Sequence, residues 1–357
     1  MKSNYDILGN HIRLIDTRNR ESITDRVLGI NIDKFFMPSV ANVIGTDLSK
    51  YKLITKGKFA CNPMHVGRDE RLPVALYDEE EPAIVSPAYF MFEVVDNSIL
   101  NEDYLMMWFR RPEFDRICWL HTDGSVRGGI TWDDICRLEL PIPPIEKQLE
   151  IVNSYKAITE RIALKKKIND NLDDTAQTLY QKYFESNSDK SSWKQGTVGD
   201  VLQLQRGHDL PRTEMTGGKY PVAGSTGTIG YHDEFTAEAP VIVMGRSGNI
   251  GNPRLYLCNC WTHNTSLYVK QIYEAEPLWV FYLLKNLNYD GFVGGSAVPT
   301  LNRNDVHAYG IAIPPLELQK FFSQKVMSLI YCKEENLSEI EKLQELQKII
   351  LTTMSSR

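Results

Sequence analysis

Two long stretches of the chain carry apolar residues at the three-and-four spacing of an amphipathic helix. In residues 145–186 the stripe is Ile151, Tyr155, Ile158, Ile162, Lys165, Asn169, Leu172, Ala176, Leu179 and Tyr183. In residues 316–357 it is Phe322, Val326, Leu329, Lys333, Asn336, Ile340, Leu343, Gln347, Ile350 and Met354. This spacing predicts two helices of the coiled-coil kind, each about 60 Å long at ~1.5 Å per residue.

Both stripes become polar near their centre. Lys165 and Asn169 interrupt the first stripe, and Lys333 and Asn336 interrupt the second. If the helices pair in antiparallel fashion, one polar centre meets the other, and such buried polar groups fix the register of a helix pair at some cost in stability. The alternative is that Lys165 and Asn169 lie on the solvent side of a drifting stripe.

Outside these helices the pattern consists of short apolar runs broken by Gly, Pro and Asn, which is typical of irregular α+β domains. A short helix is expected over residues 102–109, with Asn101 as its N-cap, and another over 278–284. A polar segment, 186–192, has the composition of a linker. Strands are expected over residues 27–32, 83–95, 138–142, 240–244, 255–257 and 266–269.

The chain contains an internal repeat. Residues 124–148 align with residues 295–319 without a gap, at a constant offset of 171 residues, and eight of the 25 pairs are identical. A period this long indicates a duplicated domain with its helix rather than a solenoid. The identical pairs are Gly124/Gly295, Ser125/Ser296, Asp134/Asp305, Ile142/Ile313, Pro143/Pro314, Pro144/Pro315, Glu146/Glu317 and Gln148/Gln319.

The repeat predicts the domain organisation. A chain of 357 residues, 42% of them hydrophobic, is long enough for two ordinary globular domains. We expect globular domains at 1–144 and 187–315, followed by helices at 145–186 and 316–357. A pseudo two-fold axis relating the two halves would place the helices antiparallel.

Charge and cysteine usage narrow the class of protein. With 46 acidic and 40 basic residues the net charge is −6, which argues against a uniformly basic nucleic-acid binder but allows basic residues to gather on one face. The six cysteines follow no disulfide rhythm, and the sequence has neither an apolar leader nor an apolar run of membrane-spanning length. We therefore expect a cytoplasmic protein that does not enter membranes.

Motifs for catalysis and metal binding are weak. Cys258, Cys260 and His263 are potential zinc ligands, but no second pair lies at finger spacing, so we expect no metal. The glycine-rich segments lack the Lys-Ser/Thr of a phosphate-binding loop. Residues 62–65 resemble the adenine methyltransferase signature only faintly and are interpreted as a turn. We expect no catalytic residues.

The helix-entry motif carries a resemblance to a known family. Residues 140–148 read Leu-Pro-Ile-Pro-Pro-Ile-Glu-Lys-Gln, and residues 311–319 read Ile-Ala-Ile-Pro-Pro-Leu-Glu-Leu-Gln. Together with Val-Ser-Pro-Ala-Tyr at 85–89 and the two Gly-Ser pairs of the repeat, they make the chain similar to the DNA-specificity subunit of type I restriction-modification enzymes.

The resemblance implies a non-catalytic role. Each globular domain would be a target-recognition domain that reads one half of a bipartite, asymmetric site in double-stranded DNA. The helix pair would set the spacer between the half-sites and dock two adenine methyltransferase subunits, and a restriction and translocation subunit would join the complex. S-adenosylmethionine, ATP and Mg²⁺ would be bound by those partners, with no cofactor in this chain.

Candidate DNA contacts are polar residues in turn-like segments, because base edges and phosphates are bound by Arg, Lys, Asn, Ser and Thr on loops. Two glycine-rich stretches, 224–230 and 245–251, would suit a close approach to DNA. Taken singly, each candidate is better explained by an ordinary turn or ion pair, whereas the set as a whole favours contacts with DNA. The candidates are Arg18, Asn19, Arg20, His65, Arg68, Arg71, Arg127, Arg206, His208, Arg212, Lys219, Ser225, Thr226, Thr228, Arg246, Ser247, Asn249 and Arg303.

Two other functions remain open at this stage. A self-contained methyltransferase or nuclease would bind S-adenosylmethionine by itself or cleave DNA with Mg²⁺ alone. An assembly scaffold whose two domains bind only protein would enrich no sequence from randomised duplexes.

Overall fold

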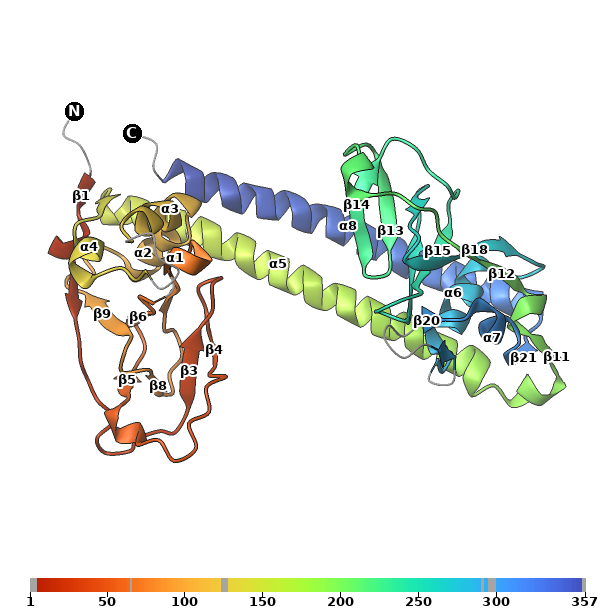
Figure 1. The fold of residues 1–357 in the computed structure, drawn as a ribbon, viewed down its shortest axis with the longest axis horizontal. Helices are drawn as coiled ribbons and strands as arrows, with labels where there is room; N and C mark the ends of the chain where they lie inside the picture. Colours follow the sequence, from red (N-terminus) through yellow and green to blue (C-terminus); the bar gives the residue numbers. More distant parts are fainter. Residues whose placement is uncertain (1–4, 65, 123–127, 290–291, 295–299, 355–357) are drawn as a thin grey trace. The chain divides into compact units, whose positions relative to one another are not determined.

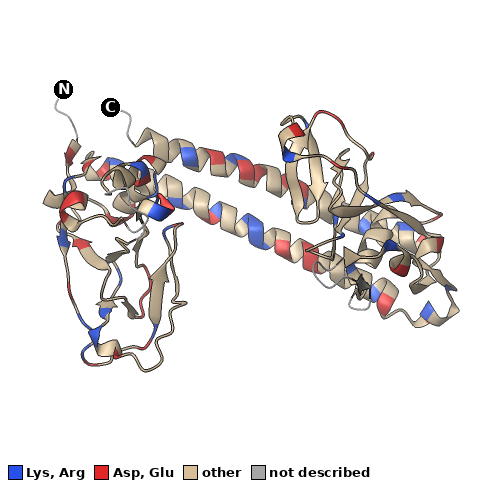
Figure 2. Ribbon diagram, in the orientation of Figure 1, with Lys and Arg blue, Asp and Glu red and all other residues tan. Residues whose placement is uncertain are grey.

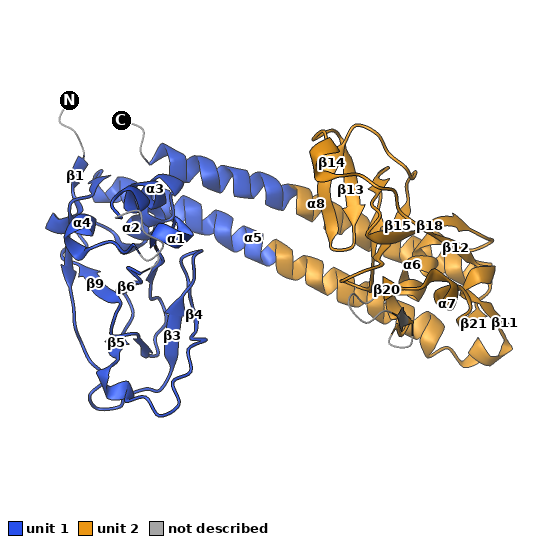
Figure 3. Ribbon diagram, in the orientation of Figure 1, with its two compact units in different colours: residues 1–164, 339–357 blue, residues 165–338 orange. Residues whose placement is uncertain are grey.

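The computed structural model describes residues 5–64, 66–122, 128–289, 292–294 and 300–354. The chain divides into two compact units (Figure 1, Figure 3): unit 1 comprises Met1–Leu164 and Glu339–Arg357, and unit 2 comprises Lys165–Ser338. The division falls inside the two long helices, α5 (Ile145–Tyr180) and α8 (Leu316–Thr353). Each unit therefore consists of one globular part and a segment of each long helix.

The globular part of unit 1 contains three sheets. β1 pairs with β10, one four-stranded sheet has the order β2-β9-β6-β7, and the other has the order β4-β3-β8-β5, in which β3 and β8 are parallel. The strands are β1 (Tyr5–Ile7), β2 (Ile12–Leu14), β3 (Val27–Ile30), β4 (Phe36–Pro38), β5 (Lys52–Ile54), β6 (Phe59–Cys61), β7 (Val74–Leu76), β8 (Ala83–Val85), β9 (Phe90–Val94) and β10 (Glu139–Pro141).

Helices cover one side of this core. Phe59 and Phe92 stack at 5.0 Å on neighbouring strands, and Phe109 of a helix packs edge-on against both. Such large apolar side chains, each no more than 1% exposed, supply most of the driving force for folding. The helices are α1 (Val66–Asp69), α2 (Glu102–Phe109), α3 (Pro112–Leu120) and α4 (Trp132–Cys136), and the 3₁₀ turns η1 (Leu8–Asn10) and η2 (Leu48–Lys50) precede them in the chain.

The prediction of one strand over residues 83–95 is wrong. The structure has β8 and β9 on different sheets, separated by a turn in which the Tyr89 amide donates to the Ser86 carbonyl at 3.1 Å. Pro87 lacks the N–H that a ladder needs, so the chain turns there. By contrast, the helix over residues 102–109 and its cap are confirmed, because Asn101 Oδ1 accepts from the Tyr104 amide at 3.0 Å.

Unit 2 has the same kinds of element. β11 pairs with β21, the four-stranded sheet has the order β12-β18-β15-β16, and the three-stranded sheet has the order β14-β13-β17. The elements are β11 (Lys194–Thr197), β12 (Leu202–Arg206), β13 (Tyr220–Gly224), β14 (Gly227–His232), β15 (Val241–Gly245), β16 (Gly251–Tyr256), β17 (Trp261–Thr262), β18 (Ser266–Ile272), β19 (Val293–Gly294), β20 (Thr300–Leu301), β21 (Gly310–Ile313), α6 (Pro277–Asn286), α7 (Arg303–His307) and the 3₁₀ turns η4 (Ser188–Ser192), η5 (Val198–Asp200) and η6 (Arg212–Glu214).

The two globular parts follow one plan. In each, the first strand pairs with the last, a 3₁₀ turn follows the first strand, and a short helix precedes the last. The 3₁₀ turn touches the short helix at a glycine: a Cβ on Gly9 would lie 2.9 Å from Cys136 Cβ, and one on Gly199 would lie 3.2 Å from the His307 carbonyl oxygen. Cys136 and His307 are themselves 171 residues apart, as the sequence repeat requires.

The long helices lie side by side within each unit. In unit 2, Phe322 of α8 packs on Tyr180 of α5 with ring centroids 6.0 Å apart, whereas Asn336 lies beside Asn169. Since the numbers run in opposite directions, the helices are antiparallel there. Every seam residue is buried or half-buried: Ile151, Tyr155, Ile158, Ile162, Leu172, Leu179, Tyr183, Phe322, Val326, Leu329, Ile340, Leu343, Ile350 and Met354.

The polar residues at the stripe centre in unit 2 also face the partner helix. Asn336 Nδ2 donates to Asn169 Oδ1 at 2.8 Å, and Lys165 Nζ donates to Asn336 Oδ1 at 2.8 Å. Asn169 is only 5% exposed, so it does not lie on the solvent side of the stripe. Beyond Tyr180, α5 continues through one π turn, Gln181–Glu185.

Within the part of the chain that the structure describes, neither long helix nor any other helix has the length and apolarity that a membrane crossing demands.

Candidate nucleic-acid interface

The two glycine-rich stretches of unit 2 meet at one edge of its globular part. Asn249 Nδ2 donates to the Ser225 carbonyl oxygen at 3.0 Å, which joins the β15–β16 turn to the β13–β14 turn. Both turns are also bound to the β17–β18 turn, because the amides of Ser225 and Arg246 donate to the side chain and the carbonyl of Thr265. Three turns therefore form one hydrogen-bonded surface, which we call the unit 2 loop cluster (residues 225–226, 246–250 and 263–265).

The glycines serve the packing of this cluster. A Cβ on Gly245 would lie 1.5 Å from the Asn249 carbonyl oxygen, so no other residue fits. Gly248 and Gly251 have φ of 75° and 71°, a region that glycine tolerates and other residues rarely adopt. The close approach expected from the sequence is thus made by neighbouring turns of the chain itself.

The cluster leaves several hydrogen-bonding side chains accessible. Thr226 and Thr228 are exposed, and Thr228 Oγ1 lies 3.4 Å from the Tyr256 hydroxyl. Arg246, Ser247 and Asn249 are half-buried, as is Ser225. Hydroxyl and amide groups held on a rigid edge are the groups that bind base edges and phosphates.

A hollow of about 590 Å³ adjoins the cluster and contains groups that the sequence analysis missed. Asn264 Nδ2 donates to Asp209 Oδ1, and Arg206 donates to the Asn264 carbonyl oxygen at 3.4 Å. Arg212 lines the same hollow and is exposed. The sequence did not predict Asp209 or Asn264 as part of this surface. Neither residue lies in a motif that indicates DNA binding, and the two are brought together only when the strands of unit 2 pair.

The remaining candidates of unit 2 lie around this edge or away from it. His208 is exposed, with its ring 6.3 Å from that of Trp261. Lys219 is exposed and lies over the Tyr220 ring at 4.7 Å. Arg303 is the first residue of α7 and is exposed.

Two of the three potential zinc ligands, His263 and Cys260, have other roles in the fold. His263 contacts Thr265 Oγ1 at 2.9 Å and the Leu210 carbonyl at 3.2 Å through its two ring nitrogens. Cys260 is fully buried, and burial raises the pKa of its thiol to about 12, which keeps it protonated and a poor metal ligand. Among the described residues no group of three His, Cys, Asp or Glu side chains could hold a metal ion.

In unit 1 one of the candidate residues, Asn19, is buried. Asn19 is 1% exposed, and its side chain donates to the carbonyls of Thr24 and Leu48 and accepts from the Ile23 amide at 2.9 Å. A buried amide whose two ends are both bonded organises its own turn. The side chain of Asn19 is therefore held inside its own turn, and its contact with DNA stays a prediction.

The other candidate arginines of unit 1 that the structure describes are partly or fully exposed. Arg18 pairs with Asp16 at 2.7 Å and donates to the Lys50 carbonyl, Arg68 pairs with Asp69, and Arg71 pairs with Asp33 at 3.1 Å. Arg20 is exposed. Exposed ion pairs of this kind are worth about 0–1 kcal/mol, so they leave these arginines available to a phosphate. His65 and Arg127 lie outside the described residues.

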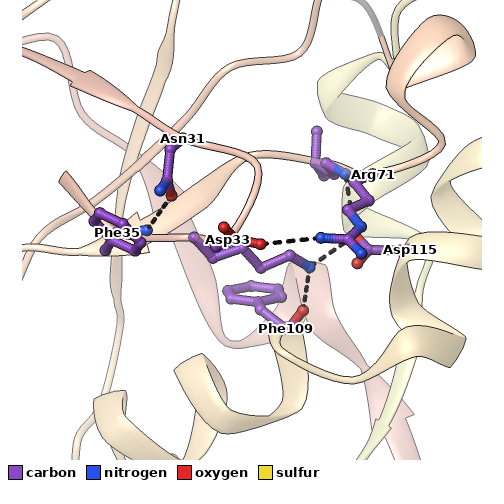
Figure 4. Close-up of polar contacts among 8 residues, drawn as sticks. Asn31, Asp33, Phe35, Arg71, Phe109 and Asp115 are labelled. Carbon is purple, nitrogen blue, oxygen red and sulfur yellow. Dashed lines mark hydrogen bonds and ion pairs between the residues drawn. The ribbon is translucent and has the colours of Figure 1, made fainter. Parts of the chain in front are cut away.

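A buried ion pair holds the β3–β4 turn beside Arg71 (Figure 4). Lys34, 4% exposed, donates to the Phe109 carbonyl and to Asp115 Oδ1 at 2.7 Å, and the same carboxylate accepts from the Leu72 amide at 3.0 Å. Burial lowers the pKa of Lys34, and the charge of Asp115 opposes that shift. The turn is thereby fixed to the corner between α2 and α3.

Both long helices carry basic as well as acidic residues (Figure 2). The formal net charge of −6 is thus not concentrated in one helix. A long-range attraction for DNA would have to come from local groups on the loops.

Comparison with known proteins finds similar sequences in one family. Residues 190–349 match the family model described as type I restriction modification DNA specificity domain. The putative type I restriction enzyme MjaX specificity subunit of Methanocaldococcus jannaschii is 21% identical over 396 residues, covering 98% of this chain and 88% of that protein. The type I restriction enzyme HindI specificity subunit of Haemophilus influenzae is 24% identical over 191 residues, covering 53% of this chain and 40% of that protein.

Solved structures agree on the fold. A type I restriction-modification S subunit from M. genitalium has a TM-score of 0.63 at 15% identity, covering all of this chain and 97% of that one. A chain from a study of complex assembly and conformational transition of the type I R-M system has a TM-score of 0.51 at 16% identity, covering 98% and 96%. The resemblance stated from the helix-entry motif is confirmed, and the curated relatives are named specificity subunits rather than catalytic ones.

Proposed function

We propose that each globular part of this chain reads one half of a bipartite, asymmetric site in double-stranded DNA, because residues 190–349 match the family model described as type I restriction modification DNA specificity domain. The observation that carries the proposal is the duplicated plan with unlike loops. In both units the first strand pairs with the last, a 3₁₀ turn follows the first strand and a short helix precedes the last, whereas the side chains on the turns differ. Two similar but unlike readers recognise two unlike half-sites.

For unit 2 the proposed reading edge is the loop cluster together with Arg206 and Arg212. Its turns are joined by hydrogen bonds, so the backbone beside the exposed Thr226 and Thr228 is held in place before DNA binds. A preorganised edge loses little conformational freedom on binding, which favours specificity. Arg206 and Arg212 add positive charge for phosphates.

For unit 1 we propose that Arg18, Arg20, Arg68 and Arg71 supply phosphate contacts. Arg68 lies in the short helix α1, and the partners of Arg18, Arg68 and Arg71 are acids that are themselves at least partly exposed. A phosphate can replace such a partner at small cost.

We further propose that α5 and α8 act as the spacer and as the docking surface for two adenine methyltransferase subunits, with a restriction and translocation subunit completing the complex. The antiparallel pairing within each unit supports a rigid spacer. S-adenosylmethionine, ATP and Mg²⁺ would be bound by the partner subunits. This chain would recognise the DNA sequence and would not catalyse a reaction.

The test is to express the full chain with its methyltransferase subunits and map methylated adenines across the host genome. A bipartite motif with a fixed spacer is expected, and exchanging residues 1–143 for the matching part of a relative should change one half of that motif only. An unchanged motif after the exchange would refute the proposal. S-adenosylmethionine binding by the isolated chain would point to a self-contained enzyme instead.

A further inference from the structure

Gln148 and Gln319 end the two copies of the Pro-Pro-x-x-x-Gln segment, and both are buried at the joint between a globular part and its long helix. Their side chains are 0% and 1% exposed. A buried amide is costly unless its groups are bonded, so the partners of these side chains are informative.

The two side chains make the same bonds in the two units. Gln148 Oε1 accepts from the Asn101 amide at 2.9 Å, and its Nε2 donates to the Pro143 carbonyl at 2.7 Å. Gln319 Oε1 accepts from the Glu276 amide at 2.9 Å, and its Nε2 donates to the Pro314 carbonyl at 2.9 Å. Gln148 Nε2 also donates to the Ile99 carbonyl at 2.8 Å.

The bonded residues occupy equivalent positions. Asn101 and Glu276 are the N-cap residues of α2 and α6, the helices at the centre of each globular core. Pro143 and Pro314 are the last residues but one before each long helix begins. One amide therefore joins three segments: the start of the core helix, the end of the globular part, and the first turns of the long helix. We call this arrangement the glutamine clamp.

The clamp supplies what the surrounding apolar contacts cannot. Around it, residues such as Ile151 and Tyr155 pack on the core of unit 1, but apolar packing is largely non-directional and allows small rotations. Hydrogen bonds weaken steeply when their angles change. An amide bonded on both sides accordingly fixes the angle between the long helix and the core helix.

We propose that Gln148 and Gln319 are positioning residues that hold each globular part at one angle on its long helix and so restrict DNA recognition to a single spacer length. This inference rests on the proposed function. Each extra base pair moves a half-site by about 3.4 Å and turns it by about 35°. If a globular part cannot rotate on its long helix, it cannot reach a half-site displaced in this way. If the hydrogen bonds of the clamp are removed, the globular part can rotate and bind the displaced half-site.

The experiment uses the full chain assembled with its methyltransferase subunits and a pool of duplexes that keep both half-sites but differ in spacer length. The wild-type complex should enrich one spacer over its neighbours in length by about tenfold or more. Gln148→Met and Gln319→Met keep the volume and remove the hydrogen bonds, and each should lower that preference to about threefold or less. The bases read in both half-sites should stay the same.

Glu146→Gln and Glu317→Gln are matched controls, because both acids are exposed, lie in the same helical turn, and form an identical pair in the repeat. They should keep the wild-type spacer preference. Gln148→Asn and Gln319→Asn, which retain an amide of shorter reach, should give intermediate preferences. Thermal unfolding of each complex shows which variants are folded at the selection temperature.

Three outcomes would overturn the inference. A folded Met variant with the wild-type spacer preference would leave the clamp without a positioning role. Altered half-site bases would make it part of base reading, and loss of folding in all four clamp variants would reduce it to a stability element. If the wild-type complex enriches no bipartite site, the proposed function itself fails.

Discussion

Lys34 is the most buried charged side chain in the turns of unit 1, at 4% exposed, and nothing in its local sequence, Asn-Ile-Asp-Lys-Phe, distinguishes it from a surface lysine. Its partner Asp115 lies 81 residues away. Asn19 likewise resembles a surface residue in the sequence, because it lies among arginines in a turn-like segment. Burial depends on which distant segment covers a turn, and one local pattern cannot report that.

Breaking the Lys34–Asp115 pair should destabilise unit 1. Asp115→Asn leaves the ammonium group of Lys34 buried without its counter-ion, and such changes cost about 3–5 kcal/mol. Arg71→Ala removes the exposed pair with Asp33 beside it and should cost no more than about 1 kcal/mol. Urea unfolding of the two variants compares these values, and equal losses would contradict the assignment of a buried pair.

His307 should make unit 2 sensitive to acid. Its Nε2 accepts from the Leu204 amide at 2.8 Å, and burial, together with the charge of Arg303, lowers the pKa of His307 below its ordinary value of 6.5. A lowered folded-state pKa stabilises the fold above the unfolded-state value, and this contribution is lost as the pH falls below it.

Melting temperatures of wild type and His307→Gln, taken at about pH 7.5 and about pH 5.5, measure this effect. The wild type should lose about 1–3 °C more than the variant, which keeps an acceptor for the Leu204 amide but does not titrate. Equal losses would show that other groups govern the acid response.

The long helices are the elements that the sequence specified best. Their seam residues recur at a regular spacing, and the proline pair before each helix marks where it begins, at Ile145 and Leu316. The strands were predicted less well, because sheet membership depends on non-local pairing: residues 83–95 form a continuous apolar run, yet Pro87 sends its two halves to different sheets. The sequence indicated the glycine-rich stretches of the unit 2 loop cluster. It did not indicate Asn264 of the cluster or Asp209 in the adjoining hollow.

The polar centre of the helix pair should distinguish its two asparagines. Asn336 bonds both Asn169 and Lys165, whereas Asn169 Nδ2 has no partner among the described residues. Asn169→Leu removes an unsatisfied buried donor together with the acceptor of Asn336 Nδ2, whereas Asn336→Leu removes a partner of both Asn169 and the half-buried Lys165. The second change should cost about 1–3 kcal/mol more than the first.

Thermal unfolding of the full chain measures both variants, and the double variant Asn169→Leu/Asn336→Leu should be more stable than Asn336→Leu alone. A larger loss from Asn169→Leu than from Asn336→Leu would contradict the hydrogen-bond pattern.

At the scale of the whole molecule, duplication would explain how one chain reads the proposed asymmetric site. Two copies of a domain with its helix retain the scaffold, including Gln148 and Gln319, while their turns have diverged. The scaffold can diverge little, since both copies must dock on the same helix pair. The turns carry no such requirement, so the proposed specificity lies in them.

If α5 and α8 together set the spacer, lengthening both should lengthen the recognised site. Seven residues add two helical turns, about 10.5 Å, which corresponds to about three base pairs. Inserting a matched heptad after residue 164 of α5 and after residue 338 of α8 keeps apolar positions opposite apolar positions in the antiparallel pair. Methylation mapping should then find both half-sites unchanged, separated by about three more base pairs.

A heptad in α5 alone shifts Asn169 away from Asn336 and should abolish bipartite methylation. An unchanged spacer in the double insertion would mean that something other than the helix pair sets the distance.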